Sequence, residues 1–523
     1  MREKIFFFLL VLGFGILLVK LFVLQIIQGD YWAKLAEGNR IRVQKISALR
    51  GIVYDRKNQV LVRNTPTGRE YLNGRACAHI LGYIAEVSQE ELENSEPGLS
   101  AGDIVGKSGI EKEYDSRLRG KDGGILEEVD AQANVVRALG KNEPIAGESL
   151  YLTIDLDLQQ KAYQVLAGKR GAVVASVPKT GEILALVSSP SYDPNIFTIQ
   201  SSASAKATAD KQKDIEAVFS DESQPMFDRA LSGLYPPGST FKIVTAIAGL
   251  EEAKIDDKTH IEDTGQINVG GRTFGNWYFK QYGKTEGSLD LVGAIRRSND
   301  IFFYTLGSWL GIDKLSQWAH KFGLGEDPGI DLPGALKGLV PDKTWKKKAK
   351  GEDWYTGDDF NTAIGQGDLL VTPLQLNRMT SVVVSDGKLC PPSLLKPKDS
   401  NWLKVGTRQK CLDLKIKEEY LKLVKEGMKQ ACSTGGTGWP FFDFGTGGPS
   451  TSSADFKRIE VGCKTGTAES SGKNNNPHAW FTLVAPIAEP QIVLTVLVEN
   501  GGEGSSVAGP IAKDILKWWF EEK

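Results

Sequence analysis

Five Ser-x-x-Lys tetrapeptides place a hydroxyl three residues before an amine, the spacing of a serine nucleophile and a lysine base. In the first turn of a helix, residues i and i+3 share a face, so the two groups lie side by side. The tetrapeptides begin at Ser176, Ser239, Ser385, Ser393 and Ser470. Turn-forming residues surround four of them, so a chance match is the default interpretation there. Only Ser239 stands at a predicted helix start, because Tyr235-Pro-Pro-Gly238 ends the preceding segment and a strongly apolar run follows.

Ser239 and Lys242 would form a nucleophile and its base if that helix is buried. The positive end of the helix dipole favours a developing oxyanion near Ser239. Burial lowers the pKa of an amine, so Lys242 could lose its proton at neutral pH and then accept the serine proton. The alternative is structural, with Ser239 as a helix cap and Lys242 as a solvated side chain. The tetrapeptide alone leaves both interpretations open.

Two further polar clusters lie next to predicted buried elements. Arg297-Ser298-Asn299-Asp300 leads into an apolar helical segment, and Lys464-Thr465-Gly466-Thr467 precedes predicted strands at 478–484 and 491–498. A glycine in such a strand lets a substrate backbone approach, while lysine and hydroxyl groups can bind a carboxylate. A second Lys-Thr-Gly, at residues 179–181, is a predicted hairpin turn without such a role.

From residue 150 onward, the chain has a regular pattern of predicted strands and helices that must position these clusters. Predicted strands at 172–177 and 182–187 form a hairpin. Predicted helices occupy residues 156–168, 241–252, 289–310, 418–431 and 507–520. Two low-complexity segments, Ser201–Lys213 and Ser433–Ser453, are predicted to be loops. The pattern indicates an α+β domain over residues 150–523.

The amino-terminal segment is long and apolar enough to span a bilayer. Residues 5–27 carry one charge, Lys20, which can snorkel to the membrane surface. A spanning helix needs about 20 apolar residues, and no small-residue cleavage site follows this segment. Arg2 and Lys4 precede it, which predicts a cytoplasmic stub of residues 1–4 and an extracytoplasmic remainder. A buried core helix is the alternative, but no polar face recurs at helical spacing.

Residues 28–149 form the predicted link between this helix and the regular domain. The segment Arg50–Asn64 is typical of two short β segments around a turn at Asp55–Asn58. Charged and glycine-punctuated stretches follow without a long periodic helix. We therefore expect a short, mostly β pedestal.

The composition restricts the function classes. The 523 residues include 63 Lys and Arg against 65 Asp and Glu, a net charge of −2. A general nucleic-acid binder needs a basic surface, so we expect no nucleic-acid partner. The four histidines are unclustered, and the five cysteines include no Cys-x-x-Cys pair. The pattern predicts no disulfide framework, no metal site and no cofactor, and Cys463 is interpreted as a small buried residue.

Taken together, the three clusters resemble the motifs of the penicilloyl serine transferases. Ser239-Thr-Phe-Lys242, Ser298-Asn299-Asp300 and Lys464-Thr-Gly-Thr467 follow the order and broad spacing of that family. The resemblance covers most of the chain and is nearest to the elongation-type class B penicillin-binding proteins, the penicillin-binding protein 2 group. Further stretches that support it are Arg50–Arg56, Gly106–Tyr114, Ser189–Asn195, Tyr235–Lys242 and Gly365–Thr372.

The resemblance implies a fold and an activity. The fold is a β-lactamase-like serine-transpeptidase domain, an antiparallel sheet flanked by helices, on a dimerisation-type pedestal. The activity is peptidoglycan D,D-transpeptidation, which crosslinks stem peptides in cell-wall elongation and maintains cell shape. Ser239 is implied as the nucleophile toward the penultimate D-Ala carbonyl, Lys242 as its general base, and the backbone N–H groups of Ser239 and Thr467 as the oxyanion hole. β-Lactams should acylate Ser239 because they mimic the D-Ala-D-Ala end.

The remaining site residues are also assigned by resemblance. Ser298 is implied as the proton relay toward the leaving amine, and Lys464 as its electrostatic support. Thr465, Gly466 and Thr467 are implied to bind the substrate, the two threonines through its carboxylate.

The chain departs from the family pattern at three places. Asp300, assigned to substrate binding, stands where much of the family has Asn, as expected for the elongation type. The family inserts a head subdomain after Asn64, whereas here Thr65–Gly68 leads directly to Arg69, so we expect an abbreviated pedestal. The Ser433–Ser453 segment is longer than usual and is interpreted either as a flap near the Lys-Thr-Gly strand or as an inert surface loop.

The resemblance also implies a location and partners. The protein is expected in the bacterial cytoplasmic membrane, with one spanning helix. The expected partners are stem peptides ending in D-Ala-D-Ala, β-lactams, a multi-pass glycan polymerase of the Rod type and other elongation-complex proteins. A division-type transpeptidase, a β-lactam hydrolase or sensor with the same site, and a catalytically dead wall-synthesis scaffold remain as alternatives.

Overall fold

The structure is a computed structural model that describes residues 2–66, 68–94, 99–130, 132–198, 205–396, 410–444, 459–470 and 476–522. The chain divides into two compact units. One comprises residues 1–51 and 116–149, and the other comprises residues 52–115 and 150–523.

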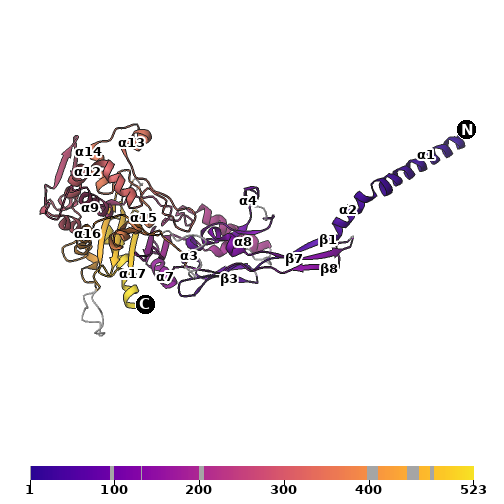
Figure 1. Cartoon of the computed structure of the whole chain (residues 1–523), viewed down its shortest axis with the longest axis horizontal. Helices are drawn as coiled ribbons and strands as arrows, with labels where there is room; N and C mark the ends of the chain where they lie inside the picture. Colours follow the sequence, from indigo (N-terminus) through magenta and orange to yellow (C-terminus); the bar gives the residue numbers. More distant parts are fainter. Residues whose placement is uncertain are drawn as a thin grey trace. The chain divides into compact units, whose positions relative to one another are not determined.

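The first unit begins with the predicted apolar helix, at the end of the chain marked N in Figure 1. Helix α1 (Arg2–Phe22) continues through a π-helical turn (Val23–Ile27) into α2 (Gly29–Arg40). No residue of α1 is buried, and the mean hydropathy within Arg2–Ile27 reaches 2.8. Lipid would solvate such a surface, so the helix is consistent with a single-pass membrane anchor. An antiparallel sheet of order β1-β7-β8 follows, formed by β1 (Ile41–Ile46), β7 (Gly123–Val129) and β8 (Val135–Asn142).

The second unit starts with a small four-stranded sheet of order β4-β3-β2-β9. Its strands are β2 (Val53–Tyr54), β3 (Val60–Thr65), β4 (Gly68–Tyr71) and β9 (Leu150–Tyr151). The predicted turn at Asp55–Asn58 is confirmed, because the Asp55 carboxylate accepts hydrogen bonds from the backbone N–H groups of Lys57 and Gln59. Short elements follow β4: α3 (Gly74–Leu81), β5 (Ile84–Glu86), α4 (Gln89–Asn94), β6 (Ile104–Gly106), α5 (Gly109–Glu113) and α6 (Asp115–Arg119). The predicted pedestal, residues 28–149, is therefore β-rich, as expected.

The larger part of the second unit is built on a five-stranded antiparallel sheet of order β11-β10-β20-β19-β18. The strands are β10 (Gly171–Ser176), β11 (Ile183–Ser189), β18 (Gly462–Ala468), β19 (His478–Ala485) and β20 (Ile492–Val498). They are almost continuously buried because helices cover both faces. Phe481 shares a core with α7 (Leu156–Leu166) and α17 (Gly504–Lys517), whereas its neighbour Trp480 shares the other core with α15 (Pro373–Val384). The predicted hairpin and the α+β class are confirmed.

Further helices pack in the core that contains α15. They are α9 (Lys242–Glu251), α11 (Leu291–Arg297), α12 (Asp300–Lys321), α14 (Thr356–Ala363) and α16 (Glu418–Ala431). The predicted burial of α9 is confirmed. The prediction of one helix over residues 289–310 is wrong, because the chain breaks between α11 and α12. Ser298 adopts a left-handed conformation with φ 53°, and the Asn299 side chain caps α12 by accepting a hydrogen bond from the Phe302 N–H at 2.9 Å.

The prediction of a loop at Ser201–Lys213 is wrong for the described part of that segment. Helix α8 (Ala205–Ser220) occupies it, because Ala, Lys and Gln favour a helix even in a low-complexity sequence. Residues 201–204 lie outside the described residues. In the Ser433–Ser453 segment, residues 433–444 form turns and a short 3-10 helix, and residues 445–453 lie outside the described residues. The remaining elements are β12 (Ile261–Asp263), β13 (Gln266–Val269), β14 (Arg272–Gly275), α10 (Trp277–Tyr282), β15 (Gly287–Leu289), α13 (Lys343–Lys350), β16 (Lys388–Leu389) and β17 (Leu412–Asp413).

The prediction that the cysteines form no disulfide framework is wrong. Cys390 is bonded to Cys411 and Cys432 to Cys463, while Cys77 is a buried free thiol. The bonded partners are 21 and 31 residues apart in the sequence. Folding brings them together, so their spacing along the chain carries no signal of pairing.

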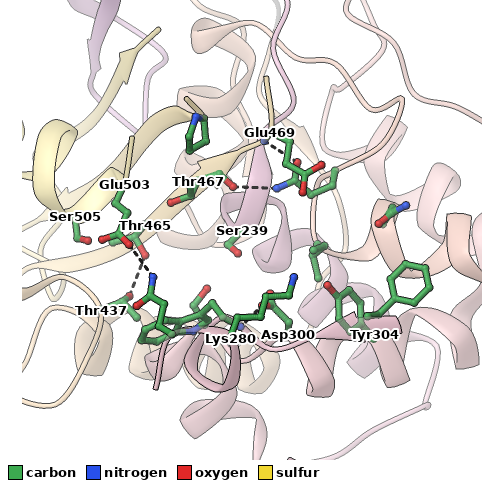
Figure 2. Close-up of a pocket in the computed structure, with 18 of the residues that line it drawn as sticks. Ser239, Lys280, Asp300, Tyr304, Thr437, Thr465, Thr467, Glu469, Glu503 and Ser505 are labelled. Carbon is green, nitrogen blue, oxygen red and sulfur yellow. Dashed lines mark hydrogen bonds between the residues drawn. The ribbon is translucent and has the colours of Figure 1, made fainter. Parts of the chain in front are cut away.

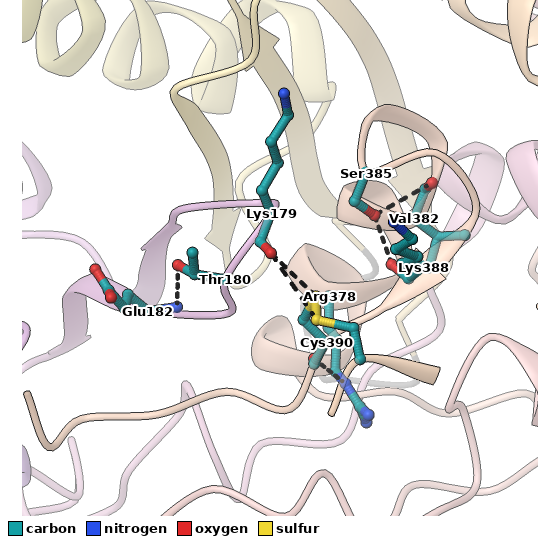
Figure 3. Close-up of a disulfide and its surroundings, with 9 residues drawn as sticks. Lys179, Thr180, Glu182, Arg378, Val382, Ser385, Lys388 and Cys390 are labelled. Atoms are coloured by element: carbon teal, nitrogen blue, oxygen red, sulfur yellow. Dashed lines mark hydrogen bonds between the residues drawn. A yellow bond between two sulfur atoms is a disulfide. The ribbon is translucent and has the colours of Figure 1, made fainter. Parts of the chain in front are cut away.

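The first disulfide lies against the turn between β10 and β11, as Figure 3 shows for Cys390 and Lys179. The Cys390 sulfur is 3.5 Å from the Lys179 carbonyl oxygen, and the Arg378 side chain donates to the Cys390 carbonyl at 2.9 Å. The Gly181 N–H closes the turn by donating to the Val177 carbonyl at 2.9 Å. The Lys-Thr-Gly at residues 179–181 is therefore a hairpin turn, as predicted.

Candidate active site

Ser239 lies in a 3-10 turn, Gly238–Phe241, that leads directly into α9. Gly238 has φ 55°, and a Cβ there would lie 2.8 Å from the Thr467 carbonyl oxygen, so the turn requires glycine to pack against β18. The Gly238 N–H donates to the Gly365 carbonyl at 2.8 Å. Ser239 is partly exposed and lines a cavity of about 940 Å³. The sequence-predicted nucleophile is thus presented to an open space.

Lys242 begins α9 and is completely buried. Its ammonium donates to the Asp300 carboxylate at 2.6 Å and to the Ser298 carbonyl at 2.8 Å, and its Nζ lies 3.4 Å from the Ser298 hydroxyl. Burial lowers the pKa of Lys242, and the negative charge of Asp300 partly opposes that shift. The structure therefore excludes the interpretation of Lys242 as a solvated helix residue.

A second buried lysine reaches the same hydroxyl. Lys464 on β18 donates to the Ser298 Oγ at 2.7 Å and to the Thr465 carbonyl at 3.0 Å. Burial lowers the pKa of Lys464 well below its usual range, and the positive charge of Lys242 lowers it further. The Ser298 hydroxyl therefore lies between two amines whose charged forms are disfavoured.

The break between α11 and α12 supplies Ser298 and Asp300, and a buried polar network fixes it. The Asp300 carboxylate accepts from the Trp277 N–H at 3.0 Å as well as from Lys242, so both of its oxygens are engaged. The Asp300 N–H donates to the Asn276 side chain at 3.2 Å. Asp300, assigned to substrate binding from the sequence, thus contacts the predicted base directly.

Asp263 lies behind this break and is 3% exposed. Its Oδ2 accepts from the side-chain amides of Asn276 at 2.9 Å and Asn299 at 3.0 Å, and from the Glu286 N–H at 2.9 Å. Its Oδ1 accepts from the Gly265 N–H at 2.9 Å. One carboxylate therefore connects the β12–α10 segment to the Ser298–Asp300 turn.

Strand β18 is at the edge of the sheet and pairs only with β19 among the described strands. A Cβ at Gly466 would lie 2.9 Å from the Thr240 methyl group, so glycine allows β18 to approach the Ser239 turn. The Thr465 hydroxyl donates to the Thr437 hydroxyl at 3.0 Å. The Thr467 carbonyl accepts from the Gln366 side chain at 2.9 Å, outside the sheet. Because the N–H and C=O of a strand residue point to the same side, the Thr467 N–H also faces away from β19.

The structure brings all the sequence-predicted site residues together around this cavity. Ser239, Ser298, Asp300, Thr465 and Thr467 line it; Gly466 lies between the two threonines, and the buried amines of Lys242 and Lys464 reach Ser298 from beneath. Figure 2 shows Ser239 between the β18 threonines and Asp300.

Sequence reasoning missed several residues that line or support the cavity. Figure 2 shows that Lys280, Tyr304, Thr437, Glu469 and Glu503 surround it. Thr437 lies in the described part of the Ser433–Ser453 segment, so that part borders the cleft. These side chains come from separate elements, and no local pattern marks them.

Two family models match the chain. The description "Penicillin binding protein transpeptidase domain" matches residues 171–517, and "Penicillin-binding Protein dimerisation domain" matches residues 66–152.

Curated relatives match over most of the chain. The peptidoglycan D,D-transpeptidase MrdA of Acinetobacter baumannii is 35% identical over 466 residues, which covers 87% of this chain and 66% of that protein. The MrdA of Salmonella typhimurium is 30% identical over 610 residues, which covers 99% of this chain and 96% of that protein.

Solved structures are similar over nearly the whole chain. PBP2 of Pseudomonas aeruginosa in complex with WCK 5153 has a TM-score of 0.77 and 33% identity, covering 92% of this chain and 97% of that one. PBP2 of Helicobacter pylori in complex with MreC has a TM-score of 0.78 and 27% identity, covering 92% and 98%. A chain of a peptidoglycan synthase complex, described as coordinating polymerization and crosslinking, has a TM-score of 0.78 and 26% identity, covering 100% and 99%.

Proposed function

The chain belongs to the penicillin-binding protein transpeptidase family and is a peptidoglycan D,D-transpeptidase of the elongation type; from this premise we propose that Ser239 carries its acyl-enzyme. The observation that carries the proposal is the position of the Ser298 hydroxyl, 2.7 Å from the Lys464 amine and 3.4 Å from that of Lys242. Such an arrangement can move a proton from a nucleophile to a leaving amine without solvent.

The first half-reaction forms an ester on Ser239. The Ser239 oxygen attacks the penultimate D-Ala carbonyl of a stem peptide, and the neutral amine of Lys242 takes its proton. The backbone N–H groups of Ser239 and Thr467 stabilise the oxyanion. When the carbon–nitrogen bond breaks, the proton passes from Lys242 through the Ser298 hydroxyl to the departing D-Ala, and Lys242 is neutral again.

The second half-reaction uses the same groups in reverse. The amine of a neighbouring stem attacks the ester, and its proton returns through Ser298 and Lys242 to the Ser239 oxygen as that oxygen leaves. A new amide, the crosslink, forms and the enzyme is regenerated. Lys464 supports both steps by holding the Ser298 hydroxyl in one orientation at 2.7 Å.

The substrate is held along the exposed edge of β18. We assign the carboxylate of the terminal D-Ala to the hydroxyl groups of Thr465 and Thr467, with Gly466 leaving room for the peptide backbone. Asp300 remains assigned to the substrate side of the site, and its contact with Lys242 supports a second role. It favours the ammonium that Lys242 becomes during each proton transfer.

The membrane arrangement is also a proposal. Residues 1–4 would be cytoplasmic, 5–27 would span the membrane, 28–149 would form the pedestal and 150–523 the transpeptidase domain outside the cytoplasm. The two disulfides support this orientation, because disulfides persist in oxidising compartments. Fusion of a periplasm-dependent reporter such as alkaline phosphatase to residue 523 tests it, and an inactive fusion would contradict it.

The partners are proposed from the chemistry and from the relatives. The substrates are stem peptides ending in D-Ala-D-Ala, and β-lactams are inhibitors. The relatives solved with MreC and in a peptidoglycan synthase complex support an elongation complex that includes a multi-pass glycan polymerase of the Rod type.

Labelling with a fluorescent penicillin tests the function. The full-length protein in detergent is compared with Ser239→Ala, and the lifetime of the adduct is followed. Labelling that requires Ser239 and persists for hours is expected. Rapid loss of the label would indicate a hydrolase instead, and a folded protein that takes no label would indicate a scaffold.

A further inference from the structure

The Gly365-Gln366-Gly367 loop connects the two parts of the active site. It follows α14, and both glycines have φ 74°, so the loop takes a shape that other residues adopt rarely. The Gln366 N–H donates to the Asn361 carbonyl at 2.8 Å. The Gln366 backbone is therefore held in place before its side chain makes any contact.

The backbone of this loop is joined to the nucleophile turn. The Gly365 carbonyl accepts from the Gly238 N–H at 2.8 Å, next to Ser239. A Cβ at Gly365 would lie 2.1 Å from the Gly238 carbonyl oxygen, so the two segments are in direct backbone contact. The position of Ser239 thus depends on the position of the loop.

The Gln366 side chain is joined to the edge strand. Its Nε2 donates to the Thr467 carbonyl at 2.9 Å, and its Oε1 accepts from the Glu469 N–H at 3.1 Å. Figure 2 shows these two bonds as dashed lines beside the labels of Thr467 and Glu469. One amide thereby restrains the backbone between residues 467 and 469, where β18 leaves the sheet.

We propose, on the basis of the proposed function, that Gln366 is a positioning residue that sets the spacing of the oxyanion hole. The two N–H groups of that hole belong to Ser239 and Thr467. Gln366 is connected to the first through Gly365 and Gly238, and to the second through the Thr467 carbonyl. It does not touch the reacting atoms, and its role is to hold two donors from different elements at one separation.

The effect on rate should exceed the effect on stability. The side-chain bonds of Gln366 are solvent-exposed, and such bonds contribute little net stability. Oxyanion stabilisation, in contrast, depends on donors placed to a fraction of an ångström, and loss of one donor slows an acyl transfer by about 100- to 1000-fold. A displaced donor should cost less, about 10- to 100-fold in the acylation rate constant.

The test measures acylation of the full-length protein in detergent by a fluorescent penicillin in a stopped-flow instrument. The concentration dependence separates the acylation rate constant from the affinity of the non-covalent complex. Gln366→Met keeps the side-chain length but removes both hydrogen bonds. Gln212→Met removes a comparable exposed amide bond, 3.1 Å to Glu216 on α8, and is the matched control. Thermal unfolding of each variant checks that it is folded.

We expect Gln366→Met to lower the acylation rate constant at least about 10-fold with nearly unchanged affinity, while Gln212→Met matches the parent protein. Faster acylation would overturn the proposal, because Gln366 would then occupy the place of a substrate amide. An unchanged rate constant would overturn it too, as would a loss confined to affinity.

A second variant keeps the proposal testable if Gln366→Met does not fold. Gln366→Glu retains the acceptor for the Glu469 N–H but loses the donor to Thr467. A carboxyl group regains a donor when it is protonated, at about pH 4.3 for an ordinary Glu. The rate of Gln366→Glu relative to the parent should therefore rise as the pH falls toward that value. A ratio independent of pH would refute the role of the donor.

Ser239→Ala distinguishes a failure of this inference from a failure of the proposed function. If the proposed function itself is wrong, the Ser239→Ala protein would still be labelled by the penicillin.

Discussion

Replacing Asp263 by Asn changes one atom in a carboxylate that does not line the cavity. Asp263 accepts four hydrogen bonds: three at Oδ2, from Asn276, Asn299 and the Glu286 N–H, and one at Oδ1, from the Gly265 N–H. All four donors surround a carboxylate that is 3% exposed. An amide cannot satisfy this set of donors, because it has one acceptor oxygen and brings an NH2 group of its own.

The cost follows from these contacts. If the amide oxygen replaces Oδ2, three bonds remain but lose their charge, and each weakens by about 1 kcal/mol. The NH2 group then faces the Gly265 N–H, and a buried donor without a partner costs about 1–3 kcal/mol. The opposite orientation loses three bonds and costs more. Asp263→Asn should therefore lower the free energy of unfolding of this domain by about 4–6 kcal/mol.

The same substitution should slow acylation. Asn276 is held less tightly when its bond to residue 263 loses its charge, so it fixes the Asp300 N–H, to which its side chain is bonded at 3.2 Å, less firmly. Asp300 in turn holds Lys242. Misplacement of a reacting group by about 1 Å costs about 100-fold in rate, so we expect a loss of about 10- to 100-fold at permissive temperature.

Urea unfolding followed by tryptophan fluorescence measures the stability change, and fluorescent-penicillin labelling measures the rate. Asp256→Asn is the matched control, because Asp256 is exposed and, among the residues that the structure describes, its carboxylate bonds within its own turn, at Lys258 and Thr259. The control should stay within about 0.5 kcal/mol of the parent protein. An Asp263→Asn protein that unfolds within about 1 kcal/mol of the parent and acylates normally would refute the reasoning.

Three further outcomes are expected. The charge of Asp300 raises the pKa of Lys242, so Asp300→Asn should lower that pKa. The rise of the acylation rate with pH should then begin at lower pH. A rise that begins at the same pH as in the parent protein would argue against Lys242 as the base. Ser298→Ala should slow acylation by about 100- to 10,000-fold, measured with penicillin under single-turnover conditions, because the shared relay hydroxyl is lost; a loss below about 3-fold would show that the proton takes another path. Joint replacement of Cys432 and Cys463 by Ser should lower the free energy of urea unfolding by about 2–4 kcal/mol, as expected for a closed loop of this length, and an unchanged midpoint would contradict that stabilisation.

The reacting groups could be predicted from the sequence because their signals are local. Ser239 and Lys242 are three residues apart at the start of an apolar helix, so spacing and context together distinguish them from four other matches. The hairpin of β10 and β11 was similarly predictable, because two short apolar runs and the turn residues between them fall within about twenty residues.

The residues that align the reacting groups could not be predicted in the same way. Gln366 meets Thr467 across 101 positions of sequence, and Asp263 meets Asn299 across 36. Neither contact has a periodic pattern, and a glutamine between two glycines resembles an ordinary turn. The disulfide of Cys432 and Cys463 has the same origin, because only the folded chain places the end of α16 beside β18.

The Asp300 carboxylate restricts the protonation states of the buried cluster formed by Lys242, Lys464 and Asp300. An amide at position 300 would not do so. With Asp300 ionised, the cluster is neutral when one of Lys242 and Lys464 is an ammonium and the other is a free amine. A buried group of charges favours that state, since both the doubly protonated and the fully deprotonated states leave a net charge without solvation. Ser298 is bonded to Lys464 and lies within 3.4 Å of Lys242, so its hydroxyl can pass the single proton between them. Before attack, this transfer can leave Lys242 as the free amine that accepts the Ser239 proton; Lys242 becomes neutral again when that proton passes through Ser298 to the departing D-Ala, and the charge of Asp300 raises the pH at which the free amine is available.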